Sequence, residues 1–518
     1  MFDLIVRDGV VFDGAGGPGR AADIGIIADR IREIGDLSTA TARNEIDAVG
    51  RYVLPGFIDA HVHGENAALD PQVQLAALRQ GVTTFVLGQD GLSFAPATPA
   101  ALHWVSRYFA AVNGSIAPHQ IDLLEPRFSI AGLLEGYHRT TALNTAYLVP
   151  LGTVRYSVMG ECSRIPDAQQ LAAMVALVEE GIDHGAVGVS SGLSYLPGRF
   201  ATITELAALS RPAARHGLPY VTHMRSYGND AATGVREACA IGHRATVPVH
   251  ISHYHGAGGP LLELVDTALA SGLDLTYDTY PYLRGCSILS KMLPDWLATA
   301  DLDQTLDALA DHTVRKAITA ETDPALWQRL TLAHVPSDRY RWTEGLRLCE
   351  AARRVGMAPD DFCAELLIAT ALGAGVVFEY PERNGMDSVR QLLRHDVHMG
   401  GSDGIYVGGH PHPRGFGAFA RLLGRHVREL RDWTWAQAAV HLAARPACRF
   451  RLSDRGTIAR GKVADLTIVA PTAVTDRATY ATPRALAIGI DDVIVNGRPV
   501  LAGAQLTGVS AGTILRPC

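Results

Sequence analysis

The sequence predicts an α/β fold: a (β/α)8 TIM-like barrel with a small β-sandwich that both termini form. In the middle of the 518-residue chain, apolar strand candidates alternate with helical patterns, which is typical of βα units. Both ends instead show short apolar runs separated by turns, as in antiparallel sheets. A hydrophobic content of 47% provides enough core for one large barrel with accessory layers.

The two β-rich ends are the first element of this prediction. Near the N-terminus, apolar runs at 4–6 and 10–12 flank the turn Asp8-Gly9. The C-terminal part repeats this style at 464–469. We therefore expect one sandwich domain from residues 1–55 and 450–518, with the barrel at 56–449.

The barrel strands follow in order along the middle of the chain. Eight apolar segments fit buried strands: Phe57 to His63, Thr83 to Asp90, Asn144 to Pro150, Ala186 to Ser191, Pro219 to Arg225, Pro248 to His253, Leu273 to Tyr282 and Val397 to Asp403. Helical patterns lie between them, for example at 169–184, 203–216 and 261–270. The rhythm breaks at 286–345, which we interpret as an insertion after the seventh strand, acting as a lid.

Composition excludes several classes of protein. The net charge of −7 gives no basic surface for nucleic acid or an anionic membrane. We find no membrane span, and the charged start of the chain does not resemble a signal peptide, so we expect a cytoplasmic protein. Seven scattered cysteines without a C-x-x-C pair argue against a disulfide framework and a structural zinc knuckle.

Lysine is rare, which bears on the kind of metal site. Only Lys291, Lys316 and Lys462 are lysines, so arginine supplies the other 43 of the 46 basic residues. None of the three lies in a strand-like run. A strand lysine that bridges two metals in carbamylated form is therefore not expected.

The segment Phe57 to Gly64 carries the first candidate metal ligands. Side chains at i and i+2 of a strand point the same way, so His61 and His63 can hold one ion together. The preceding run is apolar enough for a buried strand, and Gly64 opens a loop directly afterwards. This placement favours a metal site over two histidines in a surface turn.

Further polar residues occur where later strands end. They are Asp90, His223, His253 and Asp403. Because active sites of (β/α)8 barrels lie at the C-terminal ends of the strands, these residues should meet His61 and His63. A single histidine in an apolar strand is more often a hydrogen-bonded core residue, but an ordered set at strand ends indicates a shared site.

Imidazole and carboxylate ligands without thiolates suit zinc, manganese or iron, with zinc the usual choice for hydrolysis. A bound ion lowers the pKa of its water from about 15.7 to about 7 and polarises a carbonyl oxygen. Asp403 would take the attacking water's proton and return it to the leaving nitrogen, acting as general base and then acid.

These motifs give the chain a family resemblance. The chain resembles the amidohydrolase superfamily and, within it, the D-aminoacylases (N-acyl-D-amino-acid deacylases). Matching stretches run along the whole chain and include LPGFIDAHVHG, GVTTFVLGQDGLSFAP, YVTHMRSYG, VHISHYHGAG, DTYPYLRG and GGSDG. The resemblance implies a barrel with a β-sandwich, one or two Zn²⁺ ions (with Mn²⁺ or Fe²⁺ as alternatives) and hydrolysis of a linear amide in a small N-acyl-D-amino acid.

The resemblance also implies roles for individual residues. It makes His61 and His63 ligands of one metal site, His223 and His253 ligands of the other, and Asp403 the catalytic acid and base. Arg414 would clamp the substrate carboxylate, since a guanidinium forms two parallel charge-assisted hydrogen bonds. The other residues expected in the substrate pocket are Tyr195, His255, Tyr280, Tyr282 and Ser287.

The chain departs from the family pattern at three places that concern the chemistry. Asp90 stands where the family has a cysteine metal ligand, so a hard oxygen replaces a soft thiolate. His255 stands where the family has a lysine, so a pH-sensitive imidazole replaces a fixed ammonium. The family's Gly-His-Gly before the third loop reads Pro150-Leu151-Gly152 here. All three changes fall at predicted strand ends, which suggests an altered substrate.

Two alternatives to a D-aminoacylase are open. A cyclic-amide hydrolase of the dihydroorotase or hydantoinase kind is disfavoured because the usual carbamylated lysine has no candidate. A non-catalytic barrel used as a binding scaffold is disfavoured because every family metal position holds a residue able to coordinate. The acyl group, the accepted side chain, the metal and the oligomeric state are not determined by the sequence.

Overall fold

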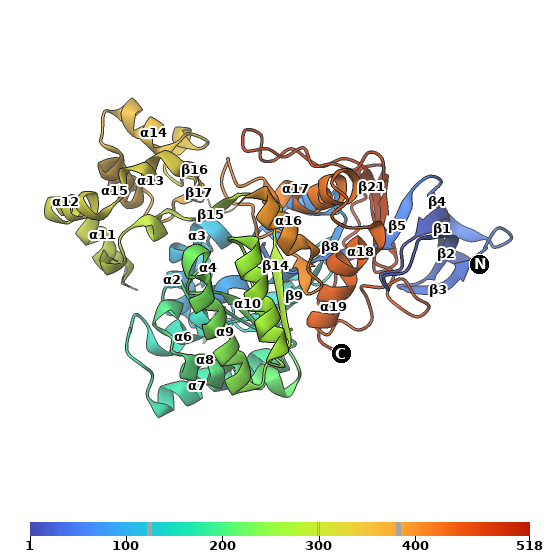
Figure 1. The fold of residues 1–518 in the computed structure, drawn as a ribbon, viewed down its shortest axis with the longest axis horizontal. Helices are drawn as coiled ribbons and strands as arrows, with labels where there is room; N and C mark the ends of the chain where they lie inside the picture. The colour runs from blue at the N-terminus through green and yellow to red at the C-terminus, as the bar shows by residue number, and fades with distance from the viewer. Residues whose placement is uncertain (122–126, 298, 300, 380–384) are drawn as a thin grey trace.

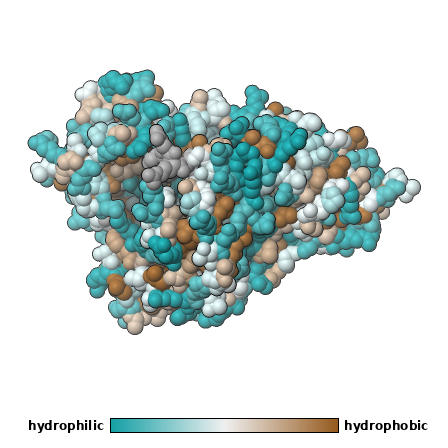
Figure 2. Space-filling view, in the orientation of Figure 1, coloured by the Kyte–Doolittle hydropathy of each residue, from teal (hydrophilic) through white to brown (hydrophobic). Residues whose placement is uncertain are grey.

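The computed structural model describes residues 1–518 apart from 122–126, 298, 300 and 380–384. It consists of a central barrel, a sheet of strands from both termini on one side, and a mixed α/β layer on the other (Figure 1). No helix among the described residues combines the length and apolar character needed to cross a membrane. The face seen in Figure 2 agrees, since its apolar residues are scattered among hydrophilic ones.

Parallel strands form the barrel. They are β6 (Phe57–Asp59), β8 (Val82–Leu87), β9 (Asn144–Tyr147), β10 (Val149–Pro150), β11 (Val189–Gly192), β12 (Tyr220–His223), β13 (Val249–Ile251), β14 (Leu275–Thr279) and β18 (His398–Gly400). They pair as β6-β8-β9 and as β10-β11-β12-β13-β14-β18. Strands β9 and β10 are separated only by Leu148, whose N–H donates to Leu87 O at 2.9 Å. The Ala60 N–H donates to Gly400 O at 3.1 Å and closes the ring, so the predicted barrel is confirmed.

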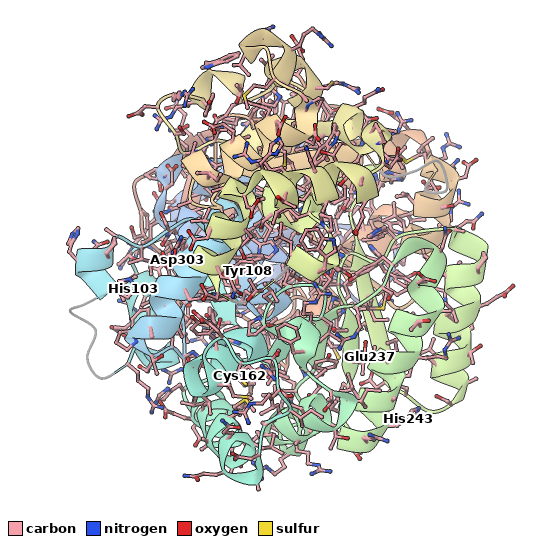
Figure 3. All side chains as sticks on the ribbon, turned by 90° about the vertical axis from the view of Figure 1, so that its left-hand side faces the viewer. His103, Tyr108, Cys162, Glu237, His243 and Asp303 are labelled. Carbon is pink, nitrogen blue, oxygen red and sulfur yellow. The ribbon has the colours of Figure 1, made fainter. Side chains whose placement is uncertain are left out.

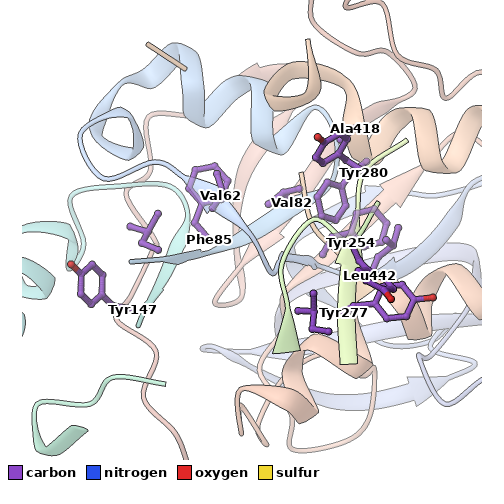
Figure 4. Packing of buried hydrophobic residues seen from close by; sticks show 14 of the residues in the cluster. Val62, Val82, Phe85, Tyr147, Tyr254, Tyr277, Tyr280, Ala418 and Leu442 are labelled. Atoms are coloured by element: carbon purple, nitrogen blue, oxygen red, sulfur yellow. The ribbon is translucent and has the colours of Figure 1, made fainter. Parts of the chain in front are cut away.

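Helices cover the outside of the barrel. They are α1 (Pro71–Leu78), α2 (Pro99–Tyr108), α3 (Ala110–Asn113), α4 (Pro118–Ile121), α5 (Ile130–Tyr137), α6 (Leu151–Met159), α7 (Ala168–Asp183), α8 (Ile203–Arg215), α9 (Ala231–Ala245), α10 (Gly258–Ala270), α16 (Met386–Arg394), α17 (Arg414–Arg421), α18 (Trp435–Ala439) and α19 (Arg445–Arg449). Sequence signals define their ends: Asp167 and Gln170 form a reciprocal capping box at the start of α7. Aromatic rings fill the space between helices and strands, as Tyr254 and Tyr277 do in Figure 4 with centroids 5.2 Å apart.

Strands from both ends of the chain form one nine-stranded mixed sheet. Its strands are β1 (Phe2–Val11), β2 (Arg20–Ile27), β3 (Arg30–Gly35), β4 (Ala42–Asp47), β5 (Tyr52–Pro55), β20 (Leu466–Val469), β21 (Ile490–Val495), β22 (Arg498–Ala502) and β23 (Gln505–Leu506). The two ends meet where β5 pairs antiparallel with β20. Because β5 ends at Pro55 and α19 at Arg449, we propose 1–55 and 450–518 as this domain and 56–449 as the barrel.

The layer inserted after β14 has its own antiparallel sheet and core. It contains β15 (Arg284–Ile288), α11 (Leu302–Ala310), α12 (His312–Glu321), α13 (Pro324–Arg329), β16 (Leu330–His334), α14 (Leu348–Val355), α15 (Pro359–Ala369) and β17 (Gly375–Glu379). The layer therefore continues beyond the predicted limit at residue 345. Periodicity marks α14 as amphipathic, but it does not show that α14 and α15 pack with Leu302 and Leu332 rather than on the barrel.

The insertion is docked on the barrel helix α2. Tyr108, at the end of α2, belongs to the same hydrophobic core as Leu332 and Phe362 of the insertion. Figure 3 shows Tyr108 where the insertion meets the barrel helices, with Asp303 close by. Asp303 of α11 pairs with Arg107 of α2 at 2.6 Å. The insertion thus lies over the C-terminal end of the barrel.

Candidate metal centre and substrate cavity

The predicted metal ligands converge at the C-terminal end of the barrel. His61 lies between β6 and β7 (Val62–His63), and Asp90 lies in the turn η2 (Gln89–Gly91). His63 and His223 are the last residues of β7 and β12, and His253 and Asp403 follow β13 and β18. The six residues are His61, His63, Asp90, His223, His253 and Asp403, and all six are buried. Strand ends separated by long stretches of sequence therefore meet at one point.

The Asp90 carboxylate lies among four histidines. Its Oδ2 is 3.3 Å from His223 Nδ1 and 3.8 Å from His63 Nε2. Its Oδ1 is 3.6 Å from His61 Nε2 and 3.8 Å from His253 Nε2. Burial alone would raise the pKa of Asp90, but the charges and hydrogen bonds of these histidines lower it well below its usual value.

Asp90 reaches this position because the backbone of its turn packs closely against Gly192. Asp90 adopts a left-handed conformation with φ of 56°, so the chain turns sharply after β8. A Cβ on Gly192, at the end of β11, would lie 2.1 Å from Asp90 O. Only glycine at position 192 therefore lets the turn enter the mouth of the barrel.

Asp403 lies beside the two histidines of the first strand. Its Oδ1 is 3.4 Å from His63 Nε2 and 3.7 Å from His61 Nε2, and its Oδ2 is 2.9 Å from Arg414 Nη1. Burial raises the pKa of a carboxyl group, but here the charges of Arg414 and His61 outweigh it and lower the pKa of Asp403 to about 2. The carboxylate is therefore ionised at neutral pH.

The arrangement fits a metal ion. His61 Nε2 and Asp90 Oδ1 are buried, face each other and have no hydrogen-bond partner. Such atoms are costly to bury unless something binds them. Two groups of ligand atoms lie within 4.8 Å of one another: His61, His63 and Asp403, and His61, Asp90 and His253. Nitrogen and carboxylate donors of this kind suit zinc, manganese or iron.

His223 is arranged differently from the other histidines. Its Nδ1 is 2.8 Å from His253 Nε2, and its Nε2 contacts Ser194 Oγ at 2.6 Å. Burial lowers the pKa of His223 to about 4, so the ring is neutral at pH 7, as a metal ligand must be. His223 and His253, which we expect to be ligands of the same metal site, thus have their rings in contact.

A second layer of residues, which no sequence pattern assigned to the site, orients the histidines. Asp278 Oδ2 accepts hydrogen bonds from His61 Nδ1 at 3.3 Å and His250 Nε2 at 2.9 Å. Asp278 Oδ1 accepts from the His253 N–H at 2.9 Å. Because the carboxylate can only accept, His61 carries its proton on Nδ1 and turns Nε2 toward Asp90. The position of Asp278 at the end of a predicted strand was the available signal.

A cavity of about 430 Å³ opens next to this cluster. Among the predicted substrate residues, those that line it are Tyr195, His255, Tyr280, Ser287 and Arg414. Tyr195 OH and Ser287 Oγ are 2.9 Å apart, and the Arg414 guanidinium lies 4.8 Å from the centroid of the Tyr280 ring. These five residues therefore line the same cavity as residues of the metal cluster.

Tyr282 and His255 differ in their relation to the cavity. Tyr282 does not line it: the turn after Tyr280 directs Tyr282 away from the cavity into the interior, where its ring packs on His412 with centroids 5.3 Å apart. The prediction of a substrate contact for Tyr282 is therefore wrong in this structure. His255 does line the cavity, with its Nδ1 donating to His253 O at 2.7 Å and its ring stacked on Tyr227.

Two further residues, Asn113 and Lys291, lie at the site although no sequence motif indicated them. Asn113, in α3, accepts a hydrogen bond on Oδ1 from His63 Nδ1 at 3.2 Å. Lys291, in the insertion, lines the cavity. No pattern in the sequence could place either residue, because α3 follows another helix rather than a strand along the chain and the fold of the insertion brings Lys291 to the cavity.

Comparison with known proteins agrees with this site. The profile of the amidohydrolase family matches residues 44–501. The D-aminoacylase of Alcaligenes xylosoxydans xylosoxydans is 34% identical over 99% of this chain and 97% of its own length. The N-acyl-D-glutamate deacylase of that organism is 34% identical over 97% of this chain and 94% of its own length. The structure of N-acyl-D-glutamate deacylase from Bordetella bronchiseptica, complexed with zinc and a phosphonate inhibitor, has a TM-score of 0.83 at 29% identity and 99% coverage of both chains. The resemblance is thus confirmed: the chain belongs to the amidohydrolase family, in its D-aminoacylase branch.

Proposed function

We propose that the protein is a metal-dependent hydrolase that removes the acyl group from N-acyl-D-amino acids. One observation carries the proposal: four histidines and two aspartates meet in a buried cluster beside a cavity, and His61 Nε2 faces Asp90 Oδ1 without a hydrogen-bond partner. The relatives are named for deacylation of D-amino acids, which supports the substrate class. The amino acids in those names differ, so they leave the accepted side chain undecided.

Zinc is the proposed metal, as one or two ions, with manganese or iron as alternatives. His61, His63, Asp90, His223, His253 and Asp403 would hold it. When bound, zinc lowers the pKa of water from about 15.7 to about 7 and polarises a carbonyl oxygen. The zinc in the related N-acyl-D-glutamate deacylase supports this choice.

Asp403 moves the proton in the proposed reaction. As a general base, its carboxylate accepts the proton of the water whose oxygen forms the new bond to the amide carbon. As a general acid, it returns that proton to the nitrogen when the carbon–nitrogen bond breaks, which releases a carboxylic acid and a free amine. The low pKa of Asp403 keeps the carboxylate ionised before the reaction.

Arg414 orients the substrate in this proposal. Its guanidinium fork suits the substrate carboxylate. Because Arg414 also contacts Asp403, it would hold the substrate carboxylate next to the reacting groups. Tyr280 lies under the guanidinium, and Tyr195, Ser287 and His255 line the rest of the cavity. These residues would fix the amide over the metal ligands.

The alternatives gain nothing from the structure. A cyclic-amide hydrolase would place a lysine at a strand end, whereas Lys316 lies in α12, Lys291 in a short turn of the insertion and Lys462 outside the strands. A binding scaffold would not need the buried ligand cluster. The expected cytoplasmic location remains a prediction.

An assay on matched enantiomers tests the proposal. Protein stripped of metal by a chelator should be inactive and should recover on zinc addition, hydrolysing N-acetyl-D-amino acids but not their L-enantiomers. Metal analysis of the same samples should follow the activity. Absence of turnover for every D-substrate with zinc, manganese and iron would refute the proposed function.

A further inference from the structure

Lys291 is the feature of the cavity that the proposed reaction does not use. It lies in η5 (Leu289–Met292), directly after β15 of the insertion, and its side chain lines the cavity. The chain has three lysines among 46 basic residues, so a lysine at this place is uncommon for this protein. The insertion carries it to the loop that follows β11, whereas Arg414 comes from the start of α17.

The contacts of Lys291 hold its ammonium near the metal cluster. The Nζ donates to Ser194 O at 3.0 Å and lies 4.8 Å from the centroid of the Tyr195 ring. That ring is 4.8 Å from the ring of His223, so one aromatic ring separates the ammonium from a candidate metal ligand. Lys291 is therefore placed within reach of a substrate bound at the cluster.

The charge of Lys291 has no acidic partner among the residues that the structure describes, since none of their carboxylates lies within 4.0 Å of its Nζ. The arginines that line the cavity differ: Arg414 pairs with Asp403 at 2.9 Å, Arg225 with Glu237 at 3.0 Å and Arg329 with Asp323 at 3.7 Å. An ammonium with unused donors at the wall of a cavity attracts an anion.

We propose that Lys291 binds a second carboxylate of the substrate, so that the enzyme prefers N-acyl-D-amino acids with two negative charges. This inference rests on the proposed function, in which Arg414 takes the α-carboxylate. Arg414 begins α17 and already pairs with Asp403, whereas Lys291 comes from the insertion and contacts the loop after β11, so we assign the two cations to different carboxylates. The second carboxylate belongs either to the amino-acid side chain or to the far end of the acyl group, and the two sources share the same chemistry.

Matched substrates test the proposal on the full-length zinc enzyme. N-acetyl-D-glutamate is compared with N-acetyl-D-glutamine, and N-succinyl-D-alanine with N-butyryl-D-alanine; each pair differs in one carboxylate. We expect kcat/KM to favour the dianion about 10-fold or more in one pair, and that pair identifies the source. In Lys291→Met this ratio should fall about tenfold, whereas Lys291→Arg should keep most of it.

Lys316→Met is the matched control, because Lys316 is an exposed lysine of α12 away from the cavity. Its ratio should equal that of the wild type. If the wild type favours neither dianion, or if Lys291→Met slows all four substrates by one factor, the proposal is overturned while the proposed function stands. If no N-acyl-D-amino acid is hydrolysed at all, the proposed function falls and this inference falls with it.

Discussion

Replacing Asp278 by asparagine should weaken metal binding without touching a ligand. The amide must place its NH₂ group at one of two positions. At Oδ1 it would face the His253 N–H, which cannot turn away. At Oδ2 it would face His61 Nδ1, and His61 could then accept only by moving its proton to Nε2, the atom needed for the metal.

Either outcome leaves a buried mismatch of about 1–3 kcal/mol. Loss of a residue that orients metal ligands typically costs about 10–100-fold in metal affinity, which agrees with that energy. Zinc affinity of Asp278→Asn should therefore fall about 10–100-fold. The assay is titration of the metal-free protein with zinc in competition with a chelator of known affinity.

Asp432→Asn provides the matched control for Asp278→Asn. Asp432 is also a buried aspartate bonded to a histidine, with Oδ2 at 2.9 Å from His426 Nδ1, but it lies outside the cavity lining. This variant should bind zinc as the wild type does. Unchanged zinc affinity in a folded Asp278→Asn protein would refute the reasoning about the proton of His61.

Three more predictions follow from the site. Asp403→Asn should lower kcat by about 10²–10⁴-fold with the melting temperature preserved, and a near-normal kcat would remove Asp403 from its role. Asp90→Cys should keep zinc, whereas Asp90→Ala should lose affinity or stoichiometry in metal analysis; equal zinc content in all three proteins would show that Asp90 is no ligand. Burial and Arg199 lower the pKa of Lys291 to about 8, against the pull of Asp295 and Asp90. Lysine loses its charge above its pKa, so in the substrate pair that shows the dianion preference the ratio of kcat/KM should fall as pH rises through about 8, and should stay level in Lys291→Arg.

The strand ends were predictable from the sequence because strand periodicity and strand termini are local properties. His61, His63 and Asp403 needed only a buried apolar run followed by a polar residue, and the barrel then brings them together. The eight predicted strands appear in the structure with shifted ends. This part of the site depends on spacing along the chain alone.

The remaining parts depend on contacts that no local pattern contains. The insertion extends beyond residue 345 because α14 and α15 pack on its hydrophobic core. Lys291 reaches Ser194 only because the insertion folds over the barrel. Tyr280 and Tyr282 flank the same proline, yet the turn directs the first into the cavity and the second away from it. Tertiary packing decides these positions.

The junction at β5 has a consequence for shortened or tagged forms of the protein. Only Gly56 separates β5 from β6, so the chain leads directly from the terminal sheet into the segment that presents His61. On its C-terminal side β5 is held by β20, and further on Leu515 N donates to Thr145 O in β9 of the barrel. Removal of the last fifty or so residues would thus expose both a sheet edge and a barrel strand, so forms shortened at this end should be less stable than the full chain.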